Sequence, residues 1–377
     1  MIQNYNGKIP LVEYPWHEHI DRLADWAVLH HSEYSRAFCY DLAMFLAFID
    51  ATSGLERYLE ICPNCPESFN AHVGFINMCS PCYEYAHKWV YQKAAKPQSG
   101  ALGKLSSEII LRFISRIFPK FESILSIGGT ETADAIIEYE NGTIIFAEVK
   151  AAPLLTYPVI FDVSSFIENA DNHEKVNLTS SQLRECNSAL YLHNQQIIPL
   201  GHVKSQDWPF KEAIDFILEK NNSTIVDGMI DTWFSAMESY KHKDRNKKIY
   251  YLANASGNPP LIAKQRDNWP DKKSISDSKT SAGMDRTDDI KKGIYQAIKI
   301  GTKYIDNKNV RTALISNLPA FRHRQEYVDP FLDMIWGYDK DTIKINSEKY
   351  IKRNKLKWVF DYIITLSEPV LRDLTNE

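Results

Sequence analysis

The stretch that decides the fold is residues 126–152, SIGGTETADAIIEYENGTIIFAEVKAA. The runs 133–139 and 143–150 are rich in residues that favour strands, and Asn141-Gly142 stands between them. An Asn-Gly pair between two such runs is the strongest short hairpin signal in a sequence, because both turn positions favour positive φ. We therefore predict two antiparallel strands joined by a tight turn.

Charged side chains stand on these strands where apolar side chains are expected. Asp134 is at the start of the first strand, and Glu148 and Lys150 are two residues apart near the end of the second. Residues i and i+2 share one face of a strand, so Glu148 and Lys150 point the same way. The preceding run 144–147 is apolar, which is typical of a buried central strand. Charges placed there are costly unless they hold a metal ion, each other or a phosphate.

The size and composition indicate an ordinary globular protein. The chain has 377 residues, of which 44% are hydrophobic and 24% charged, so we expect two or three domains. The net charge of −4 does not indicate a nucleic-acid partner, although local clusters of basic residues matter more than the total. No apolar run approaches the ~18 residues of a membrane span, and the N-terminus lacks a signal-peptide pattern. We expect a cytoplasmic protein with no membrane partner.

Four of the six cysteines form two CxxC pairs, Cys62-Cys65 and Cys79-Cys82, with thirteen residues between the pairs. Each pair aims two thiolates at one point, and two pairs complete a tetrahedral site for Zn2+. Four buried free thiols or a redox-active CxxC are the alternatives, but two matched pairs favour a metal site in a reducing compartment. Four cysteine ligands leave no open position for water, so we predict a structural zinc ion.

The spacing of Asp134, a thirteen-residue gap and then Glu148-Val149-Lys150 resembles the PD-(D/E)XK nuclease superfamily, which has the restriction-endonuclease-like fold. Ala133 stands where that family usually has a proline, a departure that leaves the metal ligands in place. The resemblance implies that Asp134 and Glu148 bind a catalytic Mg2+ and that Lys150 acts on the attacking water.

The same resemblance implies two further catalytic residues and an order of elements. Glu108 matches the acid often found on the family's first helix, and Gln296 matches the glutamine of a later helix. The family order is helix, three strands, helix, strand. We map it to a helix at 105–118, strands at 124–127, 133–139 and 143–150, a helix at 290–304 and a strand at 310–316.

The predicted fold class is therefore α/β, with a mixed central sheet flanked by helices in a restriction-endonuclease-like core. We expect an N-terminal helical region over 1–100 that carries the zinc ribbon at 62–82. The core is predicted to cover 101–320 with a large insertion over about 151–285, and 321–377 forms a C-terminal extension.

Other segments have less distinctive patterns. Residues 93–104 have the composition of a linker. The run 248–253 suggests a strand, because its apolar residues are bulky. Strands are also expected at 158–163 and 189–193, and further helices within 17–29, at 38–49, at 210–219 and at 225–240.

A second motif competes with the hairpin. Asp277-Ser278-Lys279 is itself a (D/E)-x-K, but it lacks a preceding apolar strand. We interpret 274–292 as a loop that lines the site or grips DNA, with a solvated loop as the alternative. Basic residues expected to contact phosphates or bases are Lys279, Arg286, Arg322 and Arg324.

These features together predict a Mg2+-dependent Type II restriction enzyme. It would hydrolyse double-stranded DNA at specific sequences, leaving 5′-phosphate and 3′-hydroxyl ends. One site per chain must act on two strands, which favours a homodimer. The alternatives are a structure-directed or phage-defence nuclease of the same fold, and a zinc-ribbon DNA-binding protein with an inactive nuclease core.

Overall fold

The computed structural model describes most of the chain, in two compact units. The residues it describes are 14–30, 34–51, 62, 65, 69–72, 77–86, 90–93, 99–118, 120–127, 133–166, 178–253, 282–285, 287–304, 307, 309–332, 342–346, 349–352 and 360–367. We call residues 106–152 and the described residues from 282 onward the five-stranded unit. The described residues within 14–105 and 153–281 form the four-stranded unit.

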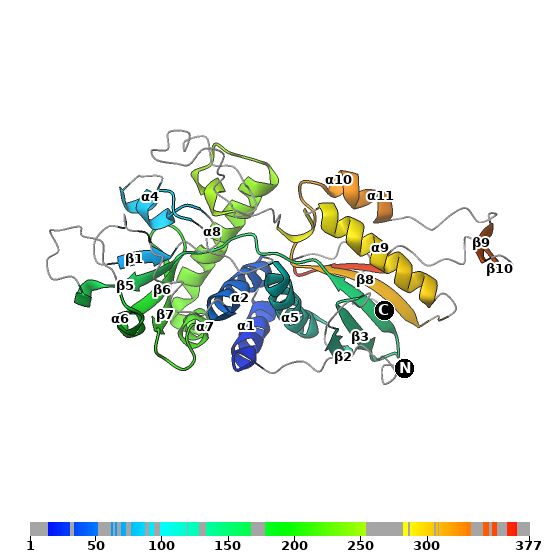
Figure 1. Ribbon diagram of the computed structural model, residues 1–377, viewed down its shortest axis with the longest axis horizontal. Coiled ribbons are helices and arrows are strands. Elements are labelled where there is room, and N and C mark those ends of the chain that lie inside the picture. Colours follow the sequence, from blue (N-terminus) through cyan, green and yellow to red (C-terminus); the bar gives the residue numbers. More distant parts are fainter. Residues whose placement is uncertain are drawn as a thin grey trace. The chain divides into compact units, whose positions relative to one another are not determined.

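The five-stranded unit is an α/β structure built on a mixed sheet with the strand order β11-β8-β4-β3-β2 (Figure 1). Strands β2, β3 and β4 are antiparallel neighbours, whereas β8 runs parallel to both β4 and β11. In chain order the elements are α5 (Ser99–Ile117, which enters this unit at Ser106), β2 (Phe121–Ser126), β3 (Ala135–Tyr139), β4 (Ile144–Val149), α9 (Thr287–Lys303), β8 (Val310–Ser316), α10 (Arg324–Tyr327), α11 (Asp329–Leu332), β9 (Thr342–Asn346), β10 (Lys349–Lys352) and β11 (Tyr362–Thr365).

The predicted hairpin is present as β3 and β4, but its turn differs from the expected one. The amide of Tyr139 donates to the carbonyl of Thr143, which encloses a three-residue loop. Only Gly142 in this loop has a positive φ, +78°, and Asn141 does not. The Asn141 side chain instead accepts a hydrogen bond from the Thr143 amide. A three-residue loop that ends in a left-handed glycine is a common hairpin connection, and here it replaces the two-residue turn we predicted.

Helix α9 covers one face of the sheet (Figure 1). Its apolar residues Ala297 and Ile300 belong to the clusters that contain Leu314 on β8 and Phe146 on β4. Gly293 permits this close approach: a Cβ there would lie 3.2 Å from Leu314 Cδ1, which would have to shift slightly, and 4.0 Å from the Cγ of Glu148. The α9 face of the sheet therefore carries Phe146 and Glu148, in keeping with the alternation of a strand.

The four-stranded unit contains an antiparallel sheet with the order β1-β5-β6-β7 and a group of helices. Helix α2 is buried along almost its whole length, α1 packs on α2 and α7, and α7 packs on β7. The elements are α1 (His17–Leu29), α2 (Ser35–Ala51), β1 (Phe69–His72), α4 (Ser80–Ala86), β5 (Val159–Asp162), α6 (Ser180–Glu185), β6 (Asn187–Tyr191), β7 (Ile197–His202), α7 (Phe210–Leu218) and α8 (Ser223–Lys241).

Most of the predicted helices and strands are confirmed, but two predictions are corrected and several short elements, β7 among them, were not predicted. The segment 248–253 is a 3-10 helix over Lys248–Leu252, not a strand; bulky apolar runs do not by themselves distinguish the two. The expected linker 93–104 is helical from Ser99 onward, because α5 starts six residues earlier than predicted. Strand β7 was not predicted, since its Pro199 and Gly201 obscure the strand pattern.

Two segments that lie far apart in the sequence share one sheet. Strand β1 comes from the predicted N-terminal region, and β5, β6 and β7 come from the predicted insertion.

In the part of the chain that the structure describes, no helix is both long and apolar enough to cross a membrane.

A buried carboxylate organises the four-stranded unit. Asp41 on α2 is fully buried and accepts hydrogen bonds from the amides of Leu154 (3.1 Å) and Leu155 (2.9 Å). It also accepts one from the Trp233 indole on α8 at 2.8 Å. Burial raises the pKa of Asp41 to about 7, although these hydrogen bonds oppose the shift.

The raised pKa predicts how Asp41 affects stability. Between pH values of about 4 and about 7 the folded chain keeps a proton that the unfolded chain releases, because the ordinary pKa is 3.8. The Asp41 contribution to the free energy of unfolding therefore falls as pH rises through this window and is constant above it. Denaturant unfolding of wild type and Asp41→Asn at several pH values measures it. Wild type should lose stability relative to the variant across the window, and parallel pH profiles would contradict the assignment.

Candidate functional site

The two predicted acids lie close together where β3 begins and β4 ends, and the same lysine contacts both. The pairing of β3 with β4 ends with Ala135 opposite Ala147, and Asp134 is the residue just before β3. The Asp134 amide also donates to the Ala147 carbonyl at 2.9 Å, which is one residue out of the β3–β4 register, so the ladder is irregular at Asp134. Two carboxylates that share one site repel each other. The pair therefore requires a cation.

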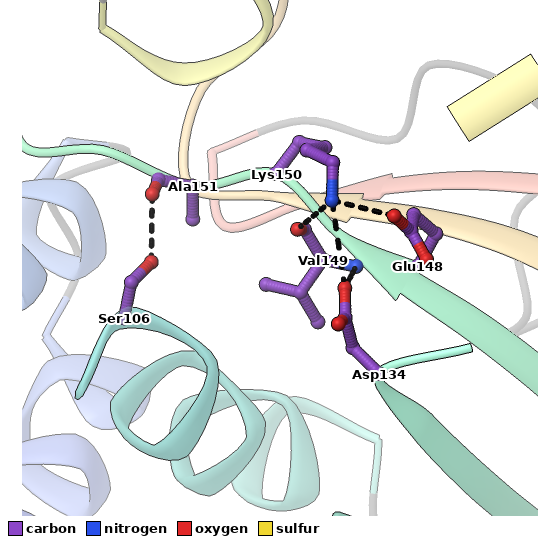
Figure 2. Close-up of polar contacts among 6 residues, drawn as sticks. All are labelled: Ser106, Asp134, Glu148, Val149, Lys150 and Ala151. Carbon is purple, nitrogen blue, oxygen red and sulfur yellow. Dashed lines mark hydrogen bonds and ion pairs between the residues drawn. The ribbon is translucent and has the colours of Figure 1, made fainter. Parts of the chain in front are cut away.

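The ammonium of Lys150 supplies that positive charge in this structure (Figure 2). Its Nζ lies 2.6 Å from Glu148 Oε1 and 3.6 Å from Asp134 Oδ2, and it also donates to the Val149 carbonyl at 2.9 Å. The Asp134 carboxylate is held in turn by the Val149 amide at 2.8 Å. The Glu148 side chain is 11% exposed, Lys150 17% and Asp134 38%, so the group opens to solvent on the Asp134 side.

Three elements fix the chain immediately after Lys150. Ser106 on α5 donates from Oγ to the Ala151 carbonyl at 2.6 Å, as Figure 2 shows. Asn317, the residue after β8, makes two hydrogen bonds to Ala152: Oδ1 accepts from its amide and Nδ2 donates to its carbonyl. The Gly283 amide also donates to that carbonyl at 3.2 Å. The backbone that carries Lys150 is thus anchored on both sides.

Gln296 and Glu108 take different positions relative to this group. Gln296 lies on α9 one turn after Gly293, the residue that faces Glu148, and its Oε1 is buried with no hydrogen-bond partner among the described residues. Glu108 on α5 is buried, and its Oε1 lies 3.8 Å from Arg112 Nε. Among described residues the one group of three or more potential metal ligands is a set of cysteines, so Glu108 does not complete a cluster with the hairpin acids.

The predicted DNA-contacting residues are only partly described. Lys279 and Arg286 lie outside the described residues, as does the rival Asp277 motif. The remaining two follow β8: Arg322 lies on the loop after it, and Arg324 is the first residue of α10. Asp285 Oδ1 accepts from the Arg322 amide at 2.7 Å, and the Arg324 side chain pairs with Asp329 at 3.0 Å on the surface.

The two CxxC pairs come together in the four-stranded unit. The Sγ atoms of Cys62 and Cys82 are 3.7 Å apart, those of Cys65 and Cys79 are 3.6 Å apart, and all four lie within 4.8 Å of one another. A tetrahedral Zn2+ with bonds of ~2.3 Å to sulfur has ligand atoms about 3.8 Å apart. The cluster therefore has the size and ligand type that suit a metal ion such as zinc. Ile160 on β5 packs against it.

The carboxylate of Glu84 connects α4, the helix that carries Cys82 of the cysteine cluster, to the sheet of the four-stranded unit. Glu84, two residues after Cys82, accepts from the hydroxyls of Tyr191 (2.6 Å) and Tyr251 (2.5 Å) and also contacts Nδ1 of His193. Burial alone would raise the pKa of Glu84, but the hydrogen bonds from His193, Tyr191 and Tyr251 outweigh it and lower the pKa to about 2. These hydrogen bonds hold the cysteine cluster against the four-stranded unit.

No protein family model, no curated protein and no solved structure matches this chain. The geometry of the two sites therefore carries the functional assignment.

Several residues that shape the hairpin site were not predicted. Ser106, Gly283 and Asn317 act through hydrogen bonds to residues far away in the sequence. Asn317 directly follows a predicted strand parallel to β4, and that position is the one signal that could have drawn attention to it. Ser106 and Gly283 carry no distinguishing local pattern.

The two hydrogen bonds between the Asn317 side chain and the Ala152 backbone, which we call the clamp, predict an effect on stability. Asn317→Ala removes both side-chain hydrogen bonds to the half-buried backbone of Ala152, whose carbonyl keeps the bond from the Gly283 amide, so the free energy of unfolding should fall by about 1–2 kcal/mol. Urea denaturation measures the change. Asn309→Ala, at an exposed position just before β8, is the matched control and should have little effect. Equal stabilities of the two variants would contradict the clamp.

The cysteine cluster predicts bound metal. Purified protein should contain about one zinc ion per chain by elemental analysis, and Cys79→Ser should lower that content and the thermal midpoint. Cys186→Ala is the control, because Cys186 is a buried cysteine outside the cluster. Full zinc content in Cys79→Ser, or equal loss in both variants, would contradict the assignment.

Proposed function

We propose that this protein is a Mg2+-dependent, sequence-specific endonuclease that hydrolyses double-stranded DNA to 5′-phosphate and 3′-hydroxyl ends. The observation that carries the proposal is the convergence of Asp134, Glu148 and Lys150 at the end of β4. The sheet on which they lie supports it, because its helix, three strands, helix and strand occur in the order that the resemblance implies.

The donor set fits a hard divalent cation. Asp134 and Glu148 offer carboxylate oxygens, which Mg2+ prefers, and the two already share one positive charge, the Lys150 ammonium. Mg2+ usually keeps several of its waters, and the 38% exposure of Asp134 leaves room for water and for a phosphate. When bound, the ion would polarise a phosphoryl oxygen and lower the pKa of a coordinated water.

The remaining chemistry falls to side chains of the chain itself. Lys150 is a compact point charge that can orient the attacking water and neutralise negative charge developing on the phosphate. The buried amide oxygen of Gln296 offers a further acceptor for that water. The anchors at Ser106 and Asn317 keep these groups in position, as a reaction that depends on alignment requires.

Other parts of the chain support sequence-specific cutting of duplex DNA. The four-stranded unit adds more than a hundred residues beyond the sheet that carries the acids, which is room for target recognition. Arg322, on the loop that begins at Asn317, and Arg324, the first residue of α10, follow β8 and can contact phosphates or bases. We propose a homodimer that places one site on each strand, and a structural zinc ion at the cysteines.

Cleavage of unmodified phage DNA in the presence of Mg2+ tests the proposal. We expect discrete fragments from wild type and a rate lower by about a hundredfold or more in Glu148→Gln and Lys150→Ala, because each removes a charge that the reaction needs. Glu122→Gln, an exposed acid on β2, is the matched control and should cut normally.

Other results would contradict the proposal in distinct ways. A smear, or cutting restricted to branched DNA, would indicate a nuclease without sequence specificity. Retained DNA binding with no cutting would leave a DNA-binding protein. Equal activity of Glu148→Gln and the control would remove the hairpin from catalysis.

A further inference from the structure

The ammonium of Lys150 occupies the position between the carboxylates that a divalent cation would take. Its Nζ contacts both Glu148 and Asp134, at 2.6 and 3.6 Å. Two cations cannot share this position, because their repulsion in a half-buried site is strong. A metal ion that binds these acids must therefore displace the ammonium, and a partly buried ammonium needs a new hydrogen-bond acceptor.

The neighbouring strand carries such an acceptor. Ser316 ends β8, and the preceding Ile315 pairs with Val149 and accepts a hydrogen bond from the Lys150 amide. Ser316 therefore lies beside Lys150, about 5 Å away across the sheet. It also lies two residues after Leu314, which faces α9, and Lys150 lies two residues after Glu148, which faces the same helix. Both side chains are on one face.

The Ser316 hydroxyl makes no hydrogen bond to a described residue while Lys150 is paired with the two carboxylates. The residue is fully buried. Buried hydroxyls without a partner are uncommon, and each one calls for an explanation such as a second state of the site. A hydroxyl oxygen can accept from an ammonium while its proton turns toward a nearby carbonyl.

We propose that Lys150 is an internal counter-ion exchanged for the metal ion, and that Ser316 is the positioning residue that receives its ammonium after the exchange. This inference rests on the proposed function. It adds that the metal-free site is held closed by its own lysine, and that the catalytic position of Lys150 depends on Ser316. Binding of the ion and positioning of the lysine are then one event.

Isothermal titration calorimetry of zinc-loaded, full-length protein with Mn2+, in the absence of DNA, measures the Mn2+ affinity. It tests both the exchange of Lys150 for the metal ion and the role of Ser316. Lys150→Met removes the ammonium and should tighten Mn2+ binding by about tenfold or more, since no cation has to be displaced. Lys292→Met, an exposed position on α9, makes the same change in net charge and should leave Mn2+ affinity unchanged. Lys150→Met that binds no more tightly than wild type would overturn the exchange.

The role of Ser316 is tested by a double-mutant cycle with Lys150. Ser316→Ala should weaken Mn2+ binding by about tenfold, because the displaced ammonium loses one charge-assisted hydrogen bond. In the Lys150→Met background the same change should have no effect on Mn2+ affinity. Ser316→Cys, whose sulfur is a weak acceptor of similar size, should behave like Ser316→Ala and replaces it if alanine impairs folding. An unchanged affinity in the wild-type background, or an equal loss in both backgrounds, would overturn the assignment.

Failure of this inference and failure of the proposed function give different results. Mn2+ affinities that follow the cycle, in a protein that does not cut DNA, would support the exchange and refute the nuclease. DNA cleavage that requires Glu148, with no tightening in Lys150→Met, would refute the exchange and support the nuclease.

Discussion

Asp134 and Glu148 share the Lys150 ammonium where β3 begins and β4 ends, and much of the five-stranded unit is arranged around the positive charge that these two carboxylates require. Strand β4 is buried from Ile144 to Val149, so Glu148 lies in a largely apolar environment. An unpaired carboxylate would be costly there. The Lys150 ammonium meets that requirement from the same strand. The site is therefore electrostatically balanced as it stands, and any ion that binds must compete with a covalently attached one.

The surrounding elements hold this balanced group in place with little freedom. Gly293 brings α9 close to Glu148, and Ser106 and Asn317 hold the backbone just after Lys150. A site built on a central strand and anchored by a helix and by the neighbouring strand's end is positioned more accurately than one built on a loop. Such accuracy suits phosphodiester hydrolysis, in which the water, the phosphate and the ion must align. In the four-stranded unit the cysteine cluster is likewise fixed by long-range hydrogen bonds, since Glu84 accepts from the hydroxyls of Tyr191 and Tyr251.

The features predicted from sequence are those set by local spacing. The hairpin followed from a turn between two β-rich runs, and the cysteine cluster from two matched pairs, because each signal lies within about thirty residues. The turn type was wrong because the loop has three residues, so only Gly142 needs a left-handed backbone. The 3-10 helix at 248–252 was mistaken for a strand, since bulky apolar residues suit both. What local patterns could not reveal is long-range: the clamp of Asn317 on Ala152, the pairing of β1 with β5, and the position of Ser316 beside Lys150.

The most direct measurement is anomalous diffraction from crystals of the protein soaked in Mn2+. We predict a manganese peak between the carboxylates of Asp134 and Glu148, with the Lys150 ammonium moved away from both and toward the Ser316 hydroxyl. An empty site with Lys150 still paired to Glu148 at high Mn2+ concentration, or a peak bound to other residues alone, would contradict the account.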